Sequence, residues 1–361
     1  TIDNEQKTLN VPNLRFPEFE GEWQENYVNE ICNEFKSGKA IKADLILDVG
    51  TYPVFGGNGL RGYTSTYNHD GLFVLIGRQG ALCGNVRSVI GKTYITEHAI
   101  AVNGNNKSDT NFLHYLFLQM DLGRFSDQSA QPGLAVNKLL KLKVITPRID
   151  EQRKIANLLR LLDERIATQS KIIEKLESLI KGIRNDVFGK LRKSVGFNAM
   201  IGDVLSYEQP QSYLVEDTEY TNEGTPVLTA NKAFVLGYTS EIEGIYDKGD
   251  CIIFDDFTLD CKYVDFSFKV KSSAIKILTA KNKELLRYTF EFLKYLDLST
   301  EEHKRHYITE TQNQEFILPT VQIIRTIAHA FYALSLWKET IVKQRYAFEK
   351  QKQYLLRQMF I

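Results

Sequence analysis

The feature that most constrains this chain of 361 residues is a pair of long helix-forming stretches, residues 149–190 and 319–361. The first stretch has no proline, and its apolar residues recur in alternating steps of three and four. That spacing is typical of a helix that packs lengthwise against another helix. Such a helix would span roughly 60 Å at 1.5 Å per residue. One compact domain does not require this length, so we expect the helix to join separate parts.

Seventh-residue repeats predict the seam between the two helices. Asp150 and Glu151 occupy the first turn of the first stretch, where negative charge complements the helix dipole, and Gln169 is a polar member of the repeat. The predicted seam residues are all apolar: Leu162, Ile166, Ile173, Leu176, Ile180, Ile183, Leu334, Ile341, Phe348 and Leu355. We expect them to form an antiparallel coiled coil.

The two stretches are related by a duplication. They align almost without gaps at an offset of about 172 residues, so that Pro147 corresponds to Pro319 and Arg153 to Arg325. Each proline follows a short apolar run that predicts a strand. A repeat of this length indicates a duplicated half rather than a solenoid, although two unrelated amphipathic helices would give a similar heptad pattern.

The duplication predicts an α+β protein with five parts. These are a tail at 1–20, a first globular domain at 21–148, a first long helix and linker at 149–195, a second globular domain at 196–318 and a second long helix at 319–361. Both domains are β-rich by pattern, and Gly71–Ile76 and Gly249–Phe254 are matching candidates for buried strands. We expect the two domains to form a pseudo-two-fold tandem that the coiled coil joins.

The composition disfavours several classes of protein. No apolar run reaches the ~18 residues that span a membrane, and the polar N-terminal sequence has no signal-peptide core. The four cysteines, Cys32, Cys83, Cys251 and Cys261, are scattered without a CxxC pair. This pattern fits a reduced cytoplasmic protein better than a disulfide framework or a zinc site. We therefore expect a cytoplasmic protein with no membrane partner.

Charge is balanced over the whole chain but unevenly distributed. Residues 149–193 hold 11 basic and 7 acidic residues, residues 319–361 hold 7 and 2, and residues 196–318 hold 12 and 21. The helices are therefore mildly basic and the second domain is acidic. This is not the uniformly basic surface of a protein that coats DNA, so any DNA contacts must come from local patches.

The first domain contains a glycine-rich loop, residues 77–85, directly after a candidate strand. It matches neither GxGxxG before a helix nor GxxxxGK[ST], which argues against a nucleotide-binding loop. A turn that requires positive φ is the structural alternative. The functional alternative is a loop that presents Arg78, Gln79 and Asn85 to DNA, because these side-chain types make paired hydrogen bonds to base edges.

The second domain keeps the strand pattern and changes the loops. Asp255 and Asp256 stand in place of the glycine-rich loop, but neighbours on a strand point to opposite faces, which argues against a shared acid/base or metal site. Residues 262–276 interleave lysines with aromatic residues, as in a strand with a basic solvent face. Residues 302–307 form a polar cluster whose HxxH spacing has no third metal ligand in view. A solvated helix end and a loop that contacts phosphates both fit this cluster.

The order of several short motifs resembles the specificity (S) subunits of type I restriction-modification systems. The motifs extend over essentially the whole chain: Val11–Pro17 with Gly21-Glu22-Trp23, Ala130–Leu134, Pro147 followed by Glu151–Ala156, Leu162-Asp163, Val264–Phe266 through Ser272–Ala274, and Glu302–Tyr307. One departure is that the second helix begins Thr320-Val321-Gln322-Ile323-Ile324-Arg325 and lacks the Glu-Gln pair of the first.

The resemblance implies two target-recognition domains, each of which reads one half of a split site in double-stranded DNA. The coiled coil would set the spacing and dock two modification subunits, which bind S-adenosylmethionine and methylate adenine. Restriction subunits, if present, would add ATP- and Mg-dependent translocation and cleavage. The chain itself would be non-catalytic, with no catalytic residue, metal or cofactor of its own. The sequence contains no recognisable methyltransferase motif, P-loop or nuclease cluster.

We predict DNA contacts in loops and strand ends of both domains. In the first domain the candidates are Asn58, Arg61, Tyr63, Thr64, Arg78, Gln79, Asn85 and Gln131. In the second domain they are Asn231, Lys232, Tyr238, Thr239, Lys262, His303, Lys304, Arg305 and His306. Arginine, asparagine and glutamine can read bases, whereas lysine, threonine and tyrosine more often hold phosphates.

Two other classes of function remain open. A coiled-coil adaptor whose two similar heads bind proteins would suit the neutral charge and the acidic second domain. It predicts no salt-dependent DNA binding, whereas a protein that contacts phosphates loses affinity as salt rises. An enzyme would require convergent acid, base or nucleophilic groups, and His69, His98 and His114 do not form a recognisable set.

Overall fold

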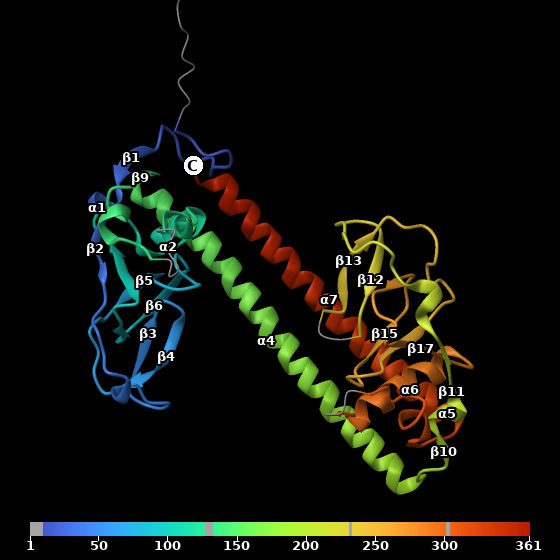
Figure 1. The fold of residues 1–361 in the computed structure, drawn as a ribbon. Helices are drawn as coiled ribbons and strands as arrows, with labels where there is room; N and C mark the ends of the chain where they lie inside the picture. The colour runs from blue at the N-terminus through green and yellow to red at the C-terminus, as the bar shows by residue number, and fades with distance from the viewer. Residues whose placement is uncertain (1–9, 127–132, 231–232, 301–303) are drawn as a thin grey trace, which may run out of the picture. The chain divides into compact units, whose positions relative to one another are not determined.

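The computed structural model describes residues 10–126, 133–230, 233–300 and 304–361. The chain forms two compact units. The first unit comprises Thr1–Gln169 and Gln344–Ile361, and the second comprises Ser170–Lys343. Each unit therefore contains one globular head together with segments of both long helices, α4 (Ile149–Ser194) and α7 (Val321–Met359) (Figure 1). The predicted α+β fold and its two long helices are confirmed.

The first head is built on an antiparallel four-stranded sheet in the order β2-β8-β5-β6. Its strands are β2 (Cys32–Ser37), β8 (Ala99–Gly104), β5 (Leu72–Gly77) and β6 (Val86–Ile90). Strand β5 lies inside the sheet, and nearly all of its continuous apolar run is buried. The predicted buried strand is therefore confirmed. Both faces of an interior strand are covered by other elements, so a continuous run of apolar side chains can be buried there.

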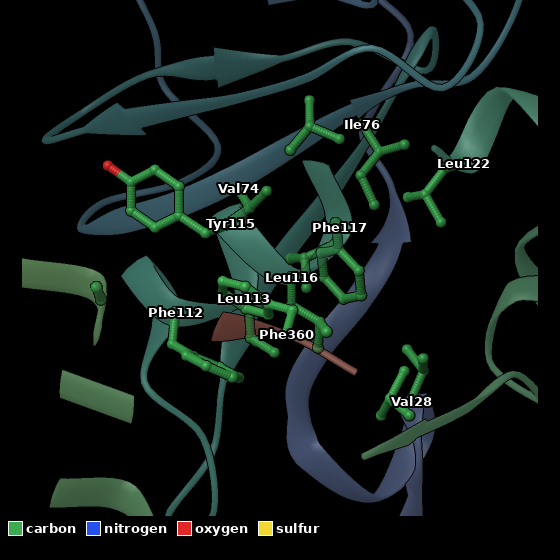
Figure 2. Close-up of a cluster of buried hydrophobic side chains, with 14 of the residues drawn as sticks. Val28, Val74, Ile76, Phe112, Leu113, Tyr115, Leu116, Phe117, Leu122 and Phe360 are labelled. Atoms are coloured by element: carbon green, nitrogen blue, oxygen red, sulfur yellow. The ribbon is translucent and has the colours of Figure 1, made fainter. Parts of the chain in front are cut away.

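Helix α2 (Thr110–Gln119) packs on this sheet and forms the core with it (Figure 2). The labelled side chains come from β5, α2 and neighbouring segments: Val28, Val74, Ile76, Phe112, Leu113, Tyr115, Leu116, Phe117, Leu122 and Phe360. Phe360 follows α7 and stacks on Phe112 with ring centroids 5.3 Å apart. The residue after α7 therefore belongs to the core of the first head.

A smaller sheet in the first head, β4-β3-β7, carries one of the candidate DNA-contact turns. Its strands are β3 (Tyr52–Gly56), β4 (Gly59–Thr64) and β7 (Tyr94–Ile95), and β3 pairs antiparallel with β4 and parallel with β7. The other elements are β1 (Gln24–Tyr27), α1 (Val28–Ile31), the 3-10 segments Ala43–Leu45 and Leu122–Phe125, α3 (Val136–Leu139) and β9 (Lys143–Thr146). Strands β1 and β9 pair antiparallel and bring the two ends of the head to the start of α4.

The second head repeats this plan. Its four-stranded sheet has the order β11-β17-β14-β15, and its three-stranded sheet has the order β13-β12-β16, with the same strand directions as in the first head. The strands are β11 (Leu205–Glu208), β17 (Ile275–Ala280), β14 (Cys251–Asp255), β15 (Cys261–Val264), β13 (Val235–Thr239), β12 (Thr225–Leu228) and β16 (Lys269–Val270). The further elements are β10 (Ala199–Met200), α5 (Ile201–Val204), 3-10 segments Pro210–Tyr213 and Thr311–Asn313, α6 (Lys283–Leu296) and β18 (Glu315–Phe316). The predicted duplication is confirmed in the strand order.

Within each unit the two long helices run antiparallel. In the first unit, Asp163 of α4 pairs with Lys352 of α7 at 2.5 Å, and the Arg165 guanidinium lies 5.9 Å from the ring centroid of Phe348. In the second unit, Glu177 pairs with Lys338 at 3.2 Å. The guanidinium of Arg184, further along α4, lies over the ring of Phe331, which comes earlier in α7.

None of the ten predicted seam residues is exposed. Leu162, Ile173, Leu176, Ile341 and Leu355 are buried, and Ile166, Ile180, Ile183, Leu334 and Phe348 are half-buried. Ile173, Leu176 and Ile341 form one apolar cluster within the second unit. Burial of these side chains between the helices accounts for the heptad spacing.

The adjacent residues Glu151 and Gln152 anchor two different segments to the start of α4. The buried Glu151 carboxylate accepts hydrogen bonds from Arg15 Nε and Nη2, each at 2.8 Å, and from Trp23 Nε1 at 3.3 Å. Gln152 Nε2 donates to the carbonyl oxygens of Lys107 and Pro147 at 2.9 and 2.8 Å. The Glu-Gln pair therefore fixes the segment before β1 and the loop before α2.

The described residues contain neither a membrane-spanning helix nor a cluster of metal ligands. None of their helices combines the length and the apolar character needed to cross a lipid bilayer. No group of three or more histidine, cysteine, aspartate or glutamate side chains among them could hold a metal ion. The cysteines, Cys32, Cys83, Cys251 and Cys261, are all free thiols.

Candidate nucleic-acid interface

A hollow of about 480 Å³ in the first head collects three of the predicted DNA-contact residues. Asn58 and Arg61 reach it from the β3–β4 hairpin, and Gln79 reaches it from the loop after β5. His98, which directly precedes β8, lines it as well. Segments that are 40 residues apart in the sequence therefore present polar side chains to one space.

Glycines allow these segments to approach each other through their backbones. A Cβ atom at Gly57 would lie 2.7 Å from the carbonyl oxygen of His98. A Cβ atom at Gly77 would lie 2.5 Å from the carbonyl oxygen of Leu82 and 3.0 Å from that of Gly57. Real Cβ contacts are not this short, so side chains at these positions would force the hairpin and the loop apart. Gly77, at the start of the glycine-rich loop, serves this close packing, whereas Gly80 and Gly84 adopt positive φ in the turn.

The side chains of the hollow have the chemistry of base recognition. Nδ1 of His98 lies 3.0 Å from Oε1 of Gln79, and Nε2 of His98 lies 3.5 Å from a carboxylate oxygen of Glu97. Arg61 and Asn58 are exposed. A guanidinium group, two amides and an imidazole can donate to and accept from base edges in a groove. The hollow is therefore suited to hydrogen bonding with a polar ligand edge.

His98 was not among the predicted contacts. A usable signal was its position immediately before the apolar run Ala99–Val102, which places it at the end of a strand and so at the edge of a sheet. The partnership with Gln79 could not be read from the sequence, because it depends on how two separate loops meet.

Arg78 lies at the junction of three segments rather than in the hollow. Its backbone N–H donates to the carbonyl oxygen of His98 at 2.9 Å, and its own carbonyl oxygen accepts from the N–H of Leu134 at 2.9 Å and from Sγ of Cys83 at 3.3 Å. The side chain is half-buried. Asn85 lines a different and smaller hollow of about 270 Å³.

Arg87 on β6 is a second basic residue that the sequence did not single out. Its guanidinium lies against Gly59 in the hairpin, where a Cβ atom would be 2.3 Å from Nη1. Its Nε is buried and has no hydrogen-bond partner among the described residues. The hairpin glycines thus also make room for a guanidinium group beside the hollow.

Two predicted contacts in the first head are less accessible. Thr64 is only 3% exposed, so its hydroxyl does not reach the surface of the unit. Tyr63 is half-buried and exchanges two backbone hydrogen bonds of 2.8 Å with Leu47. The prediction for Thr64 is corrected accordingly, because the strand turns this side chain toward the interior. Gln131 lies outside the described residues.

In the second head the predicted residues are divided between surface and interior. Tyr238, Lys304 and Arg305 are exposed. Lys262 is half-buried and pairs with Asp260 at 3.5 Å. Thr239 is 5% exposed and its Oγ1 accepts from a backbone N–H at 3.2 Å, so it is corrected in the same way as Thr64.

His306 is also corrected to an interior residue. It is 2% exposed, and its Nδ1 lies 2.8 Å from Oε2 of Glu310, whose other oxygen lies 2.8 Å from Nζ of Lys304. These two contacts lower the pKa of Glu310, with the Lys304 hydrogen bond as the larger cause. Asn231, Lys232 and His303 lie outside the described residues.

The two heads share the hydrogen bonds that place these loops. The N–H of Arg78 donates to the carbonyl oxygen of His98 at 2.9 Å, and that of Asp256 donates to the carbonyl oxygen of Ala274 at 3.0 Å. The next segment joins the same residue in each head: Leu134 N donates to Arg78 O at 2.9 Å, and His306 N donates to Asp256 O at 3.1 Å. Arg78 and Asp256 are therefore equivalent positions with opposite charge on one scaffold.

The sequence of this chain is similar to those of known proteins. Residues 20–178 match the family model described as the type I restriction modification DNA specificity domain. The chain is 42% identical over 154 residues to the type I restriction enzyme EcoprrI specificity subunit of Escherichia coli, an alignment that covers 42% of the chain and 38% of the relative. It is 45% identical over 126 residues to the EcoR124I/EcoR124II specificity subunit of the same species, which covers 33% of the chain and 31% of the relative. The chain thus spans less than half the length of these two relatives.

One solved structure is similar over almost the whole chain. The type I restriction-modification system S subunit from M. genitalium has a TM-score of 0.74, and the match covers 97% of this chain and 99% of that one. The sequence identity is 17%, so this likeness concerns the fold. It extends to both heads and both long helices, beyond the residues that the family model matches.

Proposed function

We propose that the chain is the DNA specificity subunit of a type I restriction-modification enzyme, because residues 20–178 match the family model described as the type I restriction modification DNA specificity domain. Each head would read one half of a split site in double-stranded DNA. The observation that carries the proposal is the first-head hollow, where Arg61, Asn58, Gln79 and His98 offer base-reading groups on a rigid glycine-built frame.

The long helices would set the spacing of the half-sites and dock two modification subunits. Those subunits would bind S-adenosylmethionine and methylate adenine, and restriction subunits would add ATP and Mg. Large apolar side chains on α7 within the second unit support a docking role, because Tyr332, Leu336 and Trp337 are 53%, 51% and 54% exposed. Aromatic residues on a surface helix are enriched where another protein binds.

Selection of bound DNA from a random library tests the proposal. The complex of the chain with its modification subunits is compared with the complex that carries Arg61→Ala and Gln79→Ala. The wild-type complex should select a split motif. The double variant should lose preference at one half and keep it at the other, with about 1–3 kcal/mol less discrimination for each paired contact removed.

Lys141→Ala is the matched control, because Lys141 is an exposed basic residue of the same unit that does not line the hollow. It should leave the selected motif unchanged. The affinity of the wild-type complex should also fall as salt rises, since phosphate contacts release counterions. Salt-independent or absent DNA binding by an assembled complex would contradict the proposal and favour a protein-binding adaptor.

A further inference from the structure

The interior of the second head contains an ion pair that the residues at the equivalent positions of the first head cannot form. Nζ of Lys276 lies 3.1 Å from Oδ2 of Asp256, and both side chains are 1% exposed. Nζ of Lys276 also donates to Oε1 of Gln209 at 2.9 Å. In the first head, Arg78 stands at the position of Asp256, and Ile100 on β8 stands at the position of Lys276.

The Asp256 carboxylate holds a segment of the chain as well as the lysine. Its Oδ1 accepts from the backbone N–H of His306 at 3.0 Å and from that of Tyr307 at 2.7 Å. Oδ1 therefore accepts from two backbone donors, and Oδ2 faces the ammonium group. His306 N also donates to the backbone carbonyl oxygen of Asp256 at 3.1 Å, so Tyr307 N is the donor that depends on the carboxylate. Asp255, the neighbouring carboxylate, caps its own turn instead by accepting from Phe257 N and Thr258 N at 2.9 and 3.0 Å.

Stability alone gives no reason for such a pair. Burying two charges has a desolvation cost that their attraction often only offsets, and well-packed apolar residues of similar size are frequently as stable. The first head holds its equivalent segment through the Leu134–Arg78 backbone bond without a buried carboxylate there. We therefore look for the role of the pair in the chain segment that the Asp256 carboxylate holds in place.

The positioned segment carries exposed cations. Lys304 and Arg305 directly precede His306, and both are exposed. Glu310 contacts Lys304 and His306 from the following turn, which adds a second attachment. The segment is thus fixed from the interior at residues 306 and 307 while residues 304 and 305 face outward.

We propose that Asp256 is a positioning residue for DNA contact by the second head, with Lys276 neutralising its buried charge: the Asp256 carboxylate fixes the backbone at residues 306–307 so that Lys304 and Arg305 meet the phosphates of one half-site. This inference rests on the proposed function. We call the attachment of residues 306–307 to the Asp256 carboxylate the lock. A fixed segment loses less conformational entropy on binding than a free one, so the lock contributes to affinity without touching DNA.

Two double variants separate the lock from the fold. Asp256→Asn with Lys276→Met removes both charges but keeps a side-chain oxygen that can accept from residues 306 and 307. Asp256→Leu with Lys276→Met removes that acceptor as well. DNA binding by the complex is measured with substitutions in each half-site, together with thermal unfolding of each variant.

The first variant should bind within about twofold of wild type. The second should lose about tenfold or more in affinity and relax its preference at one half-site only, since tenfold corresponds to about 1.4 kcal/mol. Unchanged affinity and unchanged preference at both half-sites in a folded Asp256→Leu/Lys276→Met variant would overturn the proposal. So would an equal loss in both double variants.

Arg305→Ala keeps the proposal testable if the second variant does not fold, because this side chain is exposed. It should weaken binding and reduce the salt dependence of affinity by about one phosphate contact, while Lys281→Ala, another exposed cation of the second head, should not. An Arg305→Ala complex with unchanged affinity and salt dependence would also overturn it.

Failure of the proposed function is distinguishable from failure of the lock. If the wild-type complex shows no sequence-specific DNA binding, the function itself is contradicted. Amide hydrogen exchange at residues 306 and 307 of the free chain then tests the lock alone. The Tyr307 amide should be protected in wild type and in the Asn/Met variant and exposed in the Leu/Met variant, whereas His306 N keeps the Asp256 carbonyl oxygen as an acceptor in all three. Equal protection of the Tyr307 amide in all three contradicts the lock.

Discussion

Glu151 and Gln152 show, at the scale of single residues, why the two long helices begin differently. Glu151 binds Arg15 and Trp23 of a separate segment that lies against the start of α4. The corresponding positions of α7 are Ile323 and Ile324, and Ile324 belongs to a buried cluster that also contains residues of the C-terminal part of α4. Apolar packing replaces the polar anchor in the second half, which accounts for the departure from the Glu-Gln motif.

Replacing Glu151 should destabilise the first unit. Glu151→Ala leaves the Arg15 guanidinium and the Trp23 indole without their shared acceptor, and we expect a loss of about 3 kcal/mol in the free energy of unfolding. Urea unfolding followed by the fluorescence of Trp23, in a background with Trp337→Phe, measures this unit. Asp150→Ala is the control, because that side chain is 72% exposed. A loss below about 0.5 kcal/mol for Glu151→Ala would show that the anchor does not stabilise the unit.

His114 gives the first unit a specific dependence on pH. Burial, and after it the charge of Lys352, lowers the pKa of this histidine from 6.5 to about 4. The unfolded chain therefore takes up the proton first as the pH falls. Stability should be fully present above pH 6.5 and decline toward pH 4, by up to roughly 3 kcal/mol.

The His114 contribution is isolated by substitution. His114→Gln should flatten the decline between pH 6.5 and 4 in the same Trp23 fluorescence measurement. Nδ1 of His114 has no hydrogen-bond partner among the described residues, so an uncharged polar side chain sacrifices no contact of that atom. The same pH slope in the variant and in wild type would assign the dependence to other groups.

At the scale of elements, the periodicity of apolar residues predicted which segments form the long helices and the buried strands. The heptads predicted the two long helices, and the continuous apolar runs predicted β5 and β14 as interior strands. The burial of Thr64 and Thr239 was missed, because an edge residue of a short strand can face either the solvent or the second sheet. Local alternation does not decide between these faces.

The convergence of the loops was only partly predictable. The sequence indicated candidate contacts in the β3–β4 hairpin and in the glycine-rich loop, and three of them, Asn58, Arg61 and Gln79, line one hollow. It did not indicate His98, Arg87 or the buried Asp256–Lys276 pair. Each of these depends on contacts between strands that are distant in the sequence, which single-chain periodicity does not encode.

The helix pair of the second unit offers a matched test of packing. Leu176→Ala should destabilise this unit by about 3 kcal/mol, because it leaves a cavity beside Ile173 and Ile341. Leu179→Ala changes an equal side chain that is 51% exposed, and it should cost less than about 0.5 kcal/mol. Native-state hydrogen exchange in residues 170–194 compares the two variants. Equal protection in the two variants would show that the seam residue Leu176 stabilises this unit no more than the exposed residue Leu179.

At the scale of the whole molecule, two units repeat one plan with different loops. The equivalent backbone bonds at Arg78 and Asp256 show that the scaffold tolerates opposite charges at one position. A scaffold of this kind can change one recognition surface without changing the other. The account therefore predicts that the heads specify their half-sites independently.

Methylation mapping tests this central claim most directly. The chain is co-expressed with its modification subunit in a host without background adenine methylation, and the genome is sequenced by a method that detects the modification. The account predicts one split motif with methylated adenine in both halves. Replacing residues 21–148 by the corresponding head of a relative should change one half only. A motif without two separable halves, a change in both halves, or no methylation by an assembled complex that binds S-adenosylmethionine would contradict the account.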